Sequence, residues 1–575
     1  MLSRAARLSE LAHRWGPAIA FVLFALLGTV WALAVPPLSA PDEVAHATKA
    51  VALYAGQLVG SPDATGALQL ALPSGYHYDP AMECYLLKGE VPASCAPEWT
   101  GDSGGDSFKN WVANYNPLYY VLVGWPSLLF HGATGLYAMR IVSAVLTAVL
   151  LALAVRLAFA APTRRWLGCA VAFMLSPMVI YLGAVVNPNG AEIAASVALM
   201  LGSLRLLEGF GSARSAPGSR SVPQPAMPGA LPRWALWVVV VLCASVVANA
   251  RALGPLWVVI LLLIAVLVCG WRPLLRMLRD PWSYAGLAGI AAAGVLSLLW
   301  TLRGGSLSSQ AVEGDAPLVG SSFLSGFVFM LRHLPDFLQQ ALGFFGWLDT
   351  PLPSPEYWFA IGVIVLVLGI AFLTLRRRDV IVLTIVMAAA VFVPALVQGY
   401  STHQTGLIWQ GRYGLFLYLA VGIVAVWLLS RPGERRRADF LSARVSWLAA
   451  SGMAAFGVLA LVFVLYRYTV GIGATFGSFV LHPEWQPPLG WIPLAVVYLL
   501  LSAVFVIWAG ACGNALGRRA ERERRLGDRL PADSRRSEPA PAAERALAPE
   551  PALARDSALA AGPAGAAGAA EAPLA

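Results

Sequence analysis

The stretch that decides the fold is Pro36-Pro37-Leu38-Ser39-Ala40-Pro41-Asp42-Glu43-Val44-Ala45-His46, which follows directly on the apolar run 16–35. That run is long enough to cross a bilayer and lacks a clear small-residue cleavage site, so we expect a retained transmembrane helix. Two adjacent carboxylates then stand at the edge of the hydrocarbon region. Charge in that position is costly unless it stays wet or has a function.

The composition of the whole chain is that of a polytopic membrane protein. Of its 575 residues, 58% are hydrophobic and only 12% are charged, with a mean hydropathy of +0.67. Soluble proteins carry about 25% charged residues. The net charge of +9 comes from short basic clusters between apolar runs. Such clusters are typical of cytoplasmic loops and do not indicate nucleic-acid binding.

The basic clusters also orient the chain. Arginines in residues 1–15 indicate a cytoplasmic start, whereas residues 36–116 contain nine acidic residues, three lysines and no arginine, which is typical of an exterior loop. The apolar segment 117–131 is short for a span. If it crossed the membrane, Arg164-Arg165 and every later basic cluster would be exterior. We therefore predict that it lies along the membrane surface as a juxtamembrane helix.

The sequence thus predicts an all-α membrane protein with about 12 transmembrane helices and both termini cytoplasmic. The expected spans are 16–35, 136–160, 166–185, 191–207, 234–248, 253–269, 282–302, one that ends at 376, 380–397, 413–429, 447–466 and 490–510. We divide the chain into a segment 1–15, a first helix 16–35, an exterior loop 36–135, a helix bundle 136–511 with exterior loops at 303–356 and 398–412, and a tail 512–575. The tail has few large apolar residues, so we expect it to be disordered and cytoplasmic.

Two of the six cysteines, Cys84 and Cys95, lie in the large polar loop. They can form a disulfide if the loop faces an oxidising compartment, or they can remain two free thiols.

Arginines at predicted exterior positions are exceptions to the inside bias of the other basic residues. A guanidinium matches two phosphate oxygens at once, so such arginines are candidates for binding a lipid phosphate. We expect Arg412 first, and Arg251 second, to have this role. For any one of them the alternative is an interfacial side chain that reaches toward lipid headgroups. The exceptions are Arg140, Arg251, Arg303, Arg332, Arg412 and Arg467.

The acidic motif has two interpretations. Ser39-Ala40-Pro41-Asp42 resembles a helix start, so Asp42 is either a helix cap, a catalytic base or both. On a helix over 41–58, Asp42, His46 and Lys49 fall near one face. His46 with Glu43 or Asp42 can bind a divalent metal, or His46 can be a wet surface histidine.

Further along the chain, Asn187 and Asn189 can hydrogen-bond a sugar. The sequence Asn187-Pro188-Asn189-Gly190 is also a strong turn signal, so both interpretations stay open.

Several short motifs together resemble the GT-C superfamily of integral-membrane glycosyltransferases. More closely, they resemble a bacterial family of predicted membrane proteins of unknown function, over residues 30–430. The motifs are Pro41-Asp42-Glu43-Val44-Ala45-His46, Asn116-Pro117-Leu118-Tyr119-Tyr120, Asn187-Pro188-Asn189, Gly346-Trp347-Leu348-Asp349 and Gln410-Gly411-Arg412-Tyr413.

The resemblance implies an inverting enzyme in the bacterial plasma membrane. It would transfer a sugar from a polyprenyl-phosphate donor to a cell-envelope glycan or glycolipid on the extracytoplasmic face, without a nucleotide cofactor. Asp42 or Glu43 would be the base. Many members place a divalent metal near a paired acid. The pair here is Asp-Glu, so whether this chain binds such a metal stays open. The expected substrate-binding residues are His46, Lys49, Asn187, Asn189, Arg251, Asp349, Gln410, Arg412 and Tyr413.

Two other classes of function remain open. A lipid-linked glycan transporter or flippase would also need many spans, and tends to show polar breaks near mid-membrane. A non-catalytic envelope-assembly protein would need none of these polar residues. The polar exceptions in this sequence gather at the predicted exterior ends, which favours chemistry at that surface.

Overall fold

The computed structural model describes residues 15–101, 104–159, 166–211, 231–305, 316–431 and 435–529. The chain divides into two units, Met1–Arg522 and Glu523–Ala575; the account below concerns the first. The tail was expected to be disordered from residue 512, but α20 (Trp491–Arg529) continues through residue 529. Residues 530–575 and the predicted cytoplasmic start at 1–14 lie outside the described residues.

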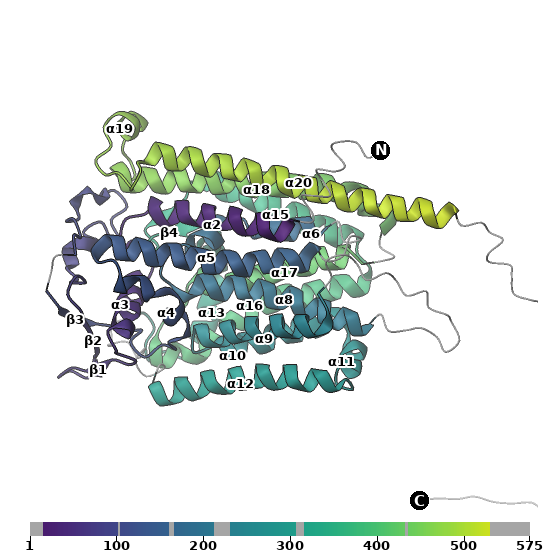
Figure 1. Cartoon of the computed structure of the whole chain (residues 1–575), viewed down its shortest axis with the longest axis horizontal. Coiled ribbons are helices and arrows are strands. Elements are labelled where there is room, and N and C mark those ends of the chain that lie inside the picture. The colour runs from purple at the N-terminus through teal and green to yellow at the C-terminus, as the bar shows by residue number, and fades with distance from the viewer. Residues whose placement is uncertain are drawn as a thin grey trace, which may run out of the picture. The chain divides into compact units, whose positions relative to one another are not determined.

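Within the described residues, ten helices are long and apolar enough to cross a membrane, and an all-α polytopic membrane protein is confirmed. An eleventh span results if α10 (Gly254–Cys269) and α11 (Trp271–Met277), bent by 113°, count as one. Figure 1 shows the long helices side by side. Besides α20 they are α2 (Gly16–Ala34), α5 (Gly132–Phe159), α8 (Pro188–Gly211), α9 (Arg233–Ala250), α12 (Pro281–Gly304), α15 (Ser354–Thr374), α16 (Arg377–Thr405), η5 with α17 (Gly411–Gly414 and Leu415–Leu429) and α18 (Arg435–Val470).

The predicted span 166–185 is broken, which accounts for part of the difference from about 12 helices. It forms two short helices, α6 (Leu167–Phe173) and α7 (Pro177–Gly183). Ser176 is extended, with φ −51° and ψ 131°, because a residue before proline avoids the helical conformation. Neighbouring helices bury this break, so its backbone polar groups do not face lipid.

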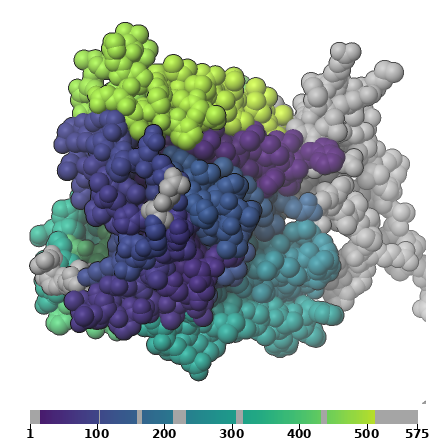
Figure 2. All heavy atoms as spheres, turned by 60° about the vertical axis from the view of Figure 1, so that its left-hand side comes forward, coloured from purple at the N-terminus to yellow at the C-terminus, as the bar shows by residue number. Residues whose placement is uncertain are grey.

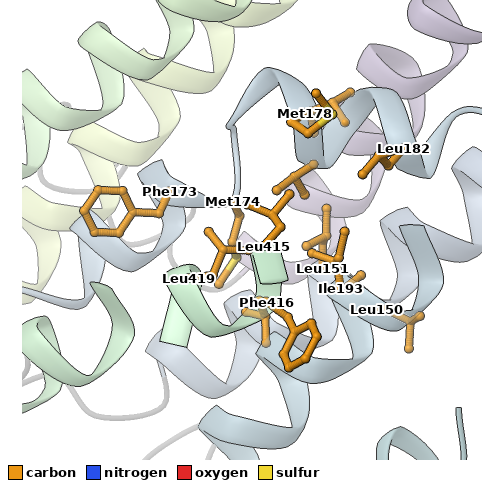
Figure 3. Packing of buried hydrophobic residues seen from close by; sticks show 14 of the residues in the cluster. Leu150, Leu151, Phe173, Met174, Met178, Leu182, Ile193, Leu415, Phe416 and Leu419 are labelled. Carbon is orange, nitrogen blue, oxygen red and sulfur yellow. The ribbon is translucent and has the colours of Figure 1, made fainter. Parts of the chain in front are cut away.

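Figure 3 shows the packing that surrounds the break. Phe173 and Met174 lie next to the break, and Met178 and Leu182 of α7 follow. They pack with Leu150 and Leu151 of α5, Ile193 of α8, and Leu415, Phe416 and Leu419 of α17. The core of the bundle is therefore made from segments far apart in sequence.

The large loop 36–131 folds as a compact layer at one end of the bundle, which we call the loop end (Figures 1 and 2). It contains a small antiparallel sheet in the order β1-β2-β3, in which Leu70 pairs with Phe108. The sequence did not predict these strands, because they are only two to five residues long. The elements are α3 (Glu43–Tyr54), β1 (Ser61–Pro62), β2 (Leu68–Leu72), η1 (Pro80–Glu83), η2 (Ala93–Cys95), β3 (Asp106–Lys109), α4 (Leu118–Val123) and η3 (Trp125–Leu128).

The predicted surface segment 117–131 is two short helical pieces, α4 and η3, instead of one helix. It does not span. Its exposed apolar side chains suit a segment that rests on a membrane. They are Leu118, Val121, Leu122, Trp125, Leu128, Leu129 and Phe130.

Both predicted exterior loops of the bundle contain regular secondary structure in their described residues. The first, 303–356, contains α13 (Phe323–Arg332), α14 (Leu334–Gly343) and the hairpin of β4 (Phe344–Phe345) and β5 (Thr350–Pro351). The second, 398–412, is shorter than predicted because α16 continues through Thr405. A last short helix, α19 (Phe476–Leu481), joins α18 to α20.

Candidate functional site

Asp42 occupies the turn between α2 and α3 at the loop end. Its backbone is left-handed, with φ 58° and ψ 8°, a conformation that aspartate tolerates better than most residues. It is the N-cap residue of α3, but its side chain makes no capping hydrogen bond. Instead, Oδ2 accepts a hydrogen bond from Nη2 of Arg412. Helix capping therefore does not account for this carboxylate.

The backbone on either side of Asp42 is held by buried groups. The side chain of Asn187 donates to the carbonyl oxygen of Pro41 at 2.9 Å, and the backbone N–H of Asn187 donates to the hydroxyl of Tyr119 at 2.9 Å. Asn187 also accepts the backbone N–H of Asn189 at 3.0 Å. The predicted turn is present, and the side chain of Asn187 bonds to the protein's own acidic loop.

Glu43, the other candidate base, points away from Asp42 into a structural ion pair. Its oxygens accept Nε and Nη2 of Arg140 at 2.8 and 2.5 Å, and Oε1 also accepts the N–H of Val186 at 3.0 Å. Both side chains are fully buried. Arg140 also binds the carbonyl oxygens of Ala32, Val35 and Pro36 at the end of α2. Glu43 therefore holds the first span to the acidic loop and has no room to act as a base.

Arg412 and Arg251 converge on the ring of Tyr413. The guanidinium carbons lie 5.1 Å (Arg412) and 4.2 Å (Arg251) from the ring centroid. Nε and Nη1 of Arg412 and Nε of Arg251 are buried and have no hydrogen-bond partner among the described residues. Buried donors of this kind are costly unless a ligand or water satisfies them. The Oε1 atom of Gln410 is in the same condition.

The other arginines predicted at this end separate into two groups. Every guanidinium nitrogen of Arg140 and Arg467 has a protein acceptor, so both are structural. Arg303 and Arg332 are exposed, as expected for interfacial side chains. Among the described residues, Arg412 and Arg251 differ from these four in having buried guanidinium nitrogens without a protein acceptor. The sequence carries no signal for that difference.

Glu192 is a buried acid that the sequence interpretation missed, and Asn189 links it to Arg251. The Nη2 atom of Arg251 donates to Oδ1 of Asn189 at 2.7 Å, and Nδ2 of Asn189 donates to Oε2 of Glu192 at 3.2 Å. Glu192 is 2% exposed. The available signal was its position as a single acidic residue inside an apolar run, where an ionisable group is a functional candidate.

His46 and Lys49, two of the predicted substrate ligands, both have partners within the protein. Nδ1 of His46 is 2.8 Å from the hydroxyl of Tyr120, and its ring packs against Tyr115 and Tyr120. Lys49 is fully buried and donates to the carbonyl oxygen of Leu58 at 2.6 Å. The helix predicted over 41–58 is shorter, since α3 is Glu43–Tyr54 and Asp42 lies just outside it.

Asp349 belongs to a separate structural cluster. It accepts the N–H of Leu87 at 3.0 Å and lies 3.5 Å from Nη2 of Arg467. Arg467 donates to the carbonyl oxygens of Tyr85, Lys88 and Val91. Cys84 and Cys95 form a disulfide, and these residues lie in the loop that it closes. Asp349 therefore fastens the disulfide loop to α18.

The electrostatic surroundings make Asp42 an anion and His46 neutral. Burial alone would raise the pKa of Asp42, but the positive charges of Arg412 and Arg251 outweigh it and hold the pKa below its ordinary value. Burial lowers the pKa of His46 to about 3, despite the opposing effect of Asp42. The site therefore contains a carboxylate and two guanidinium groups, with a neutral imidazole beside them.

A small pocket includes Arg251 in its wall. Its lining combines aromatic rings with hydroxyl and amide groups: Tyr115, Asn116, Arg251, Ala252, Ser297, Trp300 and Thr301. A small apolar groove lies between α4, α5, α8 and α9. Asn116 of the pocket donates to Asn249 of the groove at 2.7 Å, so this hydrogen bond separates the two.

A family model described as "Predicted membrane protein (DUF2142)" matches residues 24–419. No curated protein matches the chain. Among solved structures, the chain is similar to the apo crystal structure of the Archaeoglobus fulgidus oligosaccharyltransferase, with 12% identity and a TM-score of 0.35. The similarity covers 80% of this chain and 56% of that one, so this chain spans little more than half of that protein's length. A likeness this weak carries nothing about function.

Proposed function

We propose that this chain, which belongs to that family of predicted membrane proteins, is a GT-C type glycosyltransferase. It transfers a sugar from a polyprenyl-phosphate donor to a cell-envelope glycan or glycolipid on the extracytoplasmic face, without a nucleotide cofactor. The observation that carries the proposal is the ion pair of Asp42 and Arg412 beside a second arginine, with three buried guanidinium nitrogens that have no partner among the described residues.

The proposed reaction assigns one role to each side of this site. Asp42 accepts the proton of the acceptor hydroxyl, whose oxygen forms the new bond to the anomeric carbon with inversion. The bond from that carbon to the phosphate oxygen breaks, and the electron pair leaves with the lipid phosphate. Arg412 and Arg251 bind the phosphate oxygens through their unpaired donors, where charge develops in the transition state.

The other polar residues have positioning roles in this proposal. Asn187 fixes the backbone before Asp42, and Tyr413 supports both guanidinium groups. Asn189 orients Arg251. A sugar bound beside Arg251 would contact Tyr115 and Trp300 in the wall of the pocket there, since small-molecule sites commonly combine aromatic side chains with a few polar groups.

The test compares wild type with Asp42→Asn in a strain that lacks this protein. Both are expressed at matched membrane levels, with Arg332→Gln as a control for an exposed arginine at the same end. We expect wild type and Arg332→Gln to restore one envelope sugar or linkage and Asp42→Asn to restore none. Full restoration by Asp42→Asn would remove the base from the proposal and move the transporter and assembly functions ahead.

A further inference from the structure

The resemblance to GT-C enzymes raises the question of a divalent metal at the acidic motif, and the donor set there does not fit one. Protein sites for Mg²⁺, Ca²⁺ or Mn²⁺ gather several carboxylate, carbonyl or imidazole ligands around one point. Over the described ranges, no group of three or more His, Cys, Asp or Glu side chains is close enough to hold an ion.

Each of the three candidate ligands faces a different partner. Glu43 is saturated by Arg140 and the N–H of Val186. His46 is only 1% exposed and is enclosed by tyrosine rings, with its Nδ1 atom at the hydroxyl of Tyr120. Collecting these side chains around a cation would require breaking a fully buried ion pair.

Asp42 is the acid of the motif that pairs with Arg412, and its surroundings repel a cation. Its Oδ2 atom already has a positive partner in Arg412, and Arg251 adds a second positive charge. A dication placed there would face two guanidinium groups of the same sign. An anion would instead be attracted by both.

The unpaired atoms point to the same class of ligand. Nε and Nη1 of Arg412 and Nε of Arg251 are donors, and donors need acceptor oxygens. Arg412 is 3% exposed, so bulk water does not replace such a partner. Both guanidinium groups lie near the ring of Tyr413, which attracts each of them.

We infer that Arg412 and Arg251 supply the positive charge that a divalent cation supplies in metal-dependent enzymes, so that this site binds a prenyl phosphate as an anion without any metal. The inference rests on the proposed function only for the identity of the ligand. The bound group is a phosphate monoester or diester. Its oxygens accept hydrogen bonds from the guanidinium groups, and its negative charge is repelled by the carboxylate of Asp42.

The experiment measures binding of farnesyl phosphate, a short prenyl phosphate, to the purified full chain in detergent. Affinity is measured once in EDTA and once in excess Mg²⁺, for wild type, Arg412→Gln, Arg251→Gln and Arg332→Gln. A parallel titration with Mn²⁺, followed by electron paramagnetic resonance, compares wild type with Asp42→Asn.

We expect wild type to bind equally well in EDTA and in Mg²⁺, within about twofold, and each site variant to lose about tenfold or more in affinity, as for loss of a charge-assisted hydrogen bond. Arg332→Gln should bind as wild type does. Three results would overturn the inference: affinity that falls in EDTA and returns with Mg²⁺, a stoichiometric Mn²⁺ signal that Asp42→Asn removes, or no binding to wild type in either condition.

The wild-type comparison in EDTA and Mg²⁺ stands even if one variant fails to fold. It also separates this inference from the proposed function. Metal-free binding without any sugar transfer in cells would leave the inference intact and refute the glycosyltransferase proposal. Sugar transfer that requires a metal would support the glycosyltransferase proposal and refute the inference of metal-free binding.

Discussion

Arg412 donates a hydrogen bond to Asp42 across 370 residues of sequence, and this contact joins the first loop of the protein to the start of α17. The carboxylate is partly accessible while the arginine is almost fully enclosed, with side-chain exposures of 19% and 4%. The pair is therefore open on the acidic side and closed on the basic side. An acceptor hydroxyl can therefore approach Asp42. A phosphate that binds Arg412 must either displace Asp42 from the arginine or share the arginine with it.

The shape of the Arg412 side chain should matter as well as its charge. We predict that Arg412→Lys loses most sugar transfer, on the order of tenfold to a hundredfold, because lysine lacks the planar fork that binds two oxygens. The measurement is the amount of the affected envelope sugar per unit of membrane protein. Arg303→Lys, an exposed arginine at the same end, is the matched control and should keep normal transfer. Equal transfer by both variants would contradict phosphate binding by Arg412.

The pair of Glu43 and Arg140 should control stability and not chemistry. Arg140→Met leaves a buried carboxylate without its partner, which costs about 3–5 kcal/mol of unfolding free energy. We therefore expect a much lower melting temperature in detergent. The double variant Glu43→Gln/Arg140→Met should recover part of the loss. A melting temperature unchanged by Arg140→Met would show that the pair is not structural.

Lys49 should be dispensable for transfer, contrary to its predicted role as a substrate ligand. Lys49→Met keeps the apolar stem and removes only the hydrogen bond to Leu58. We expect transfer within about twofold of wild type, because the lost hydrogen bond contributes about 1 kcal/mol to stability and takes no part in the reaction. A complete loss of transfer in a folded Lys49→Met variant would return Lys49 to the site.

His46 should make the protein less stable in acid. Its pKa is about 3 when folded and about 6.5 when unfolded, so between these values the unfolded chain binds the additional proton. Stability is therefore complete above pH 6.5 and falls as the pH drops toward 3, by about 2 kcal/mol at pH 5. Urea unfolding of wild type and His46→Gln at pH 7 and pH 5 measures this. A pH dependence as steep in His46→Gln as in wild type would assign it to other groups.

The disulfide Cys84–Cys95 should stabilise the loop that Arg467 binds. Closing a loop of this length is worth about 3 kcal/mol in chain entropy. The variant Cys84→Ser/Cys95→Ser should be cleaved faster by protease within residues 84–95. Cys243→Ser, which removes a buried thiol elsewhere, serves as the control. Equal cleavage of both variants would show that the contacts of Arg467 suffice alone.

Much of the architecture could be read from hydropathy and charge, because a bilayer demands apolar helices of a set length. That reasoning located most spans and the large loop. It failed at Ser176-Pro177, where a proline breaks an apolar run inside the protein, and at the short strands of the loop. In both places packing against neighbours overrides the local hydropathy signal.

The sequence by itself determined the class of protein, the position of the acidic motif at a membrane edge, and the short set of arginines from which a phosphate site would come. Only the tertiary structure decided among them. Glu43 and Asp42 are adjacent in sequence, yet one is saturated by Arg140 and the other faces Arg412. Arginines with the same predicted position differ in whether their donors have acceptors. The physical reason is that hydrogen-bond satisfaction depends on the contacts between distant helices, which no local pattern records.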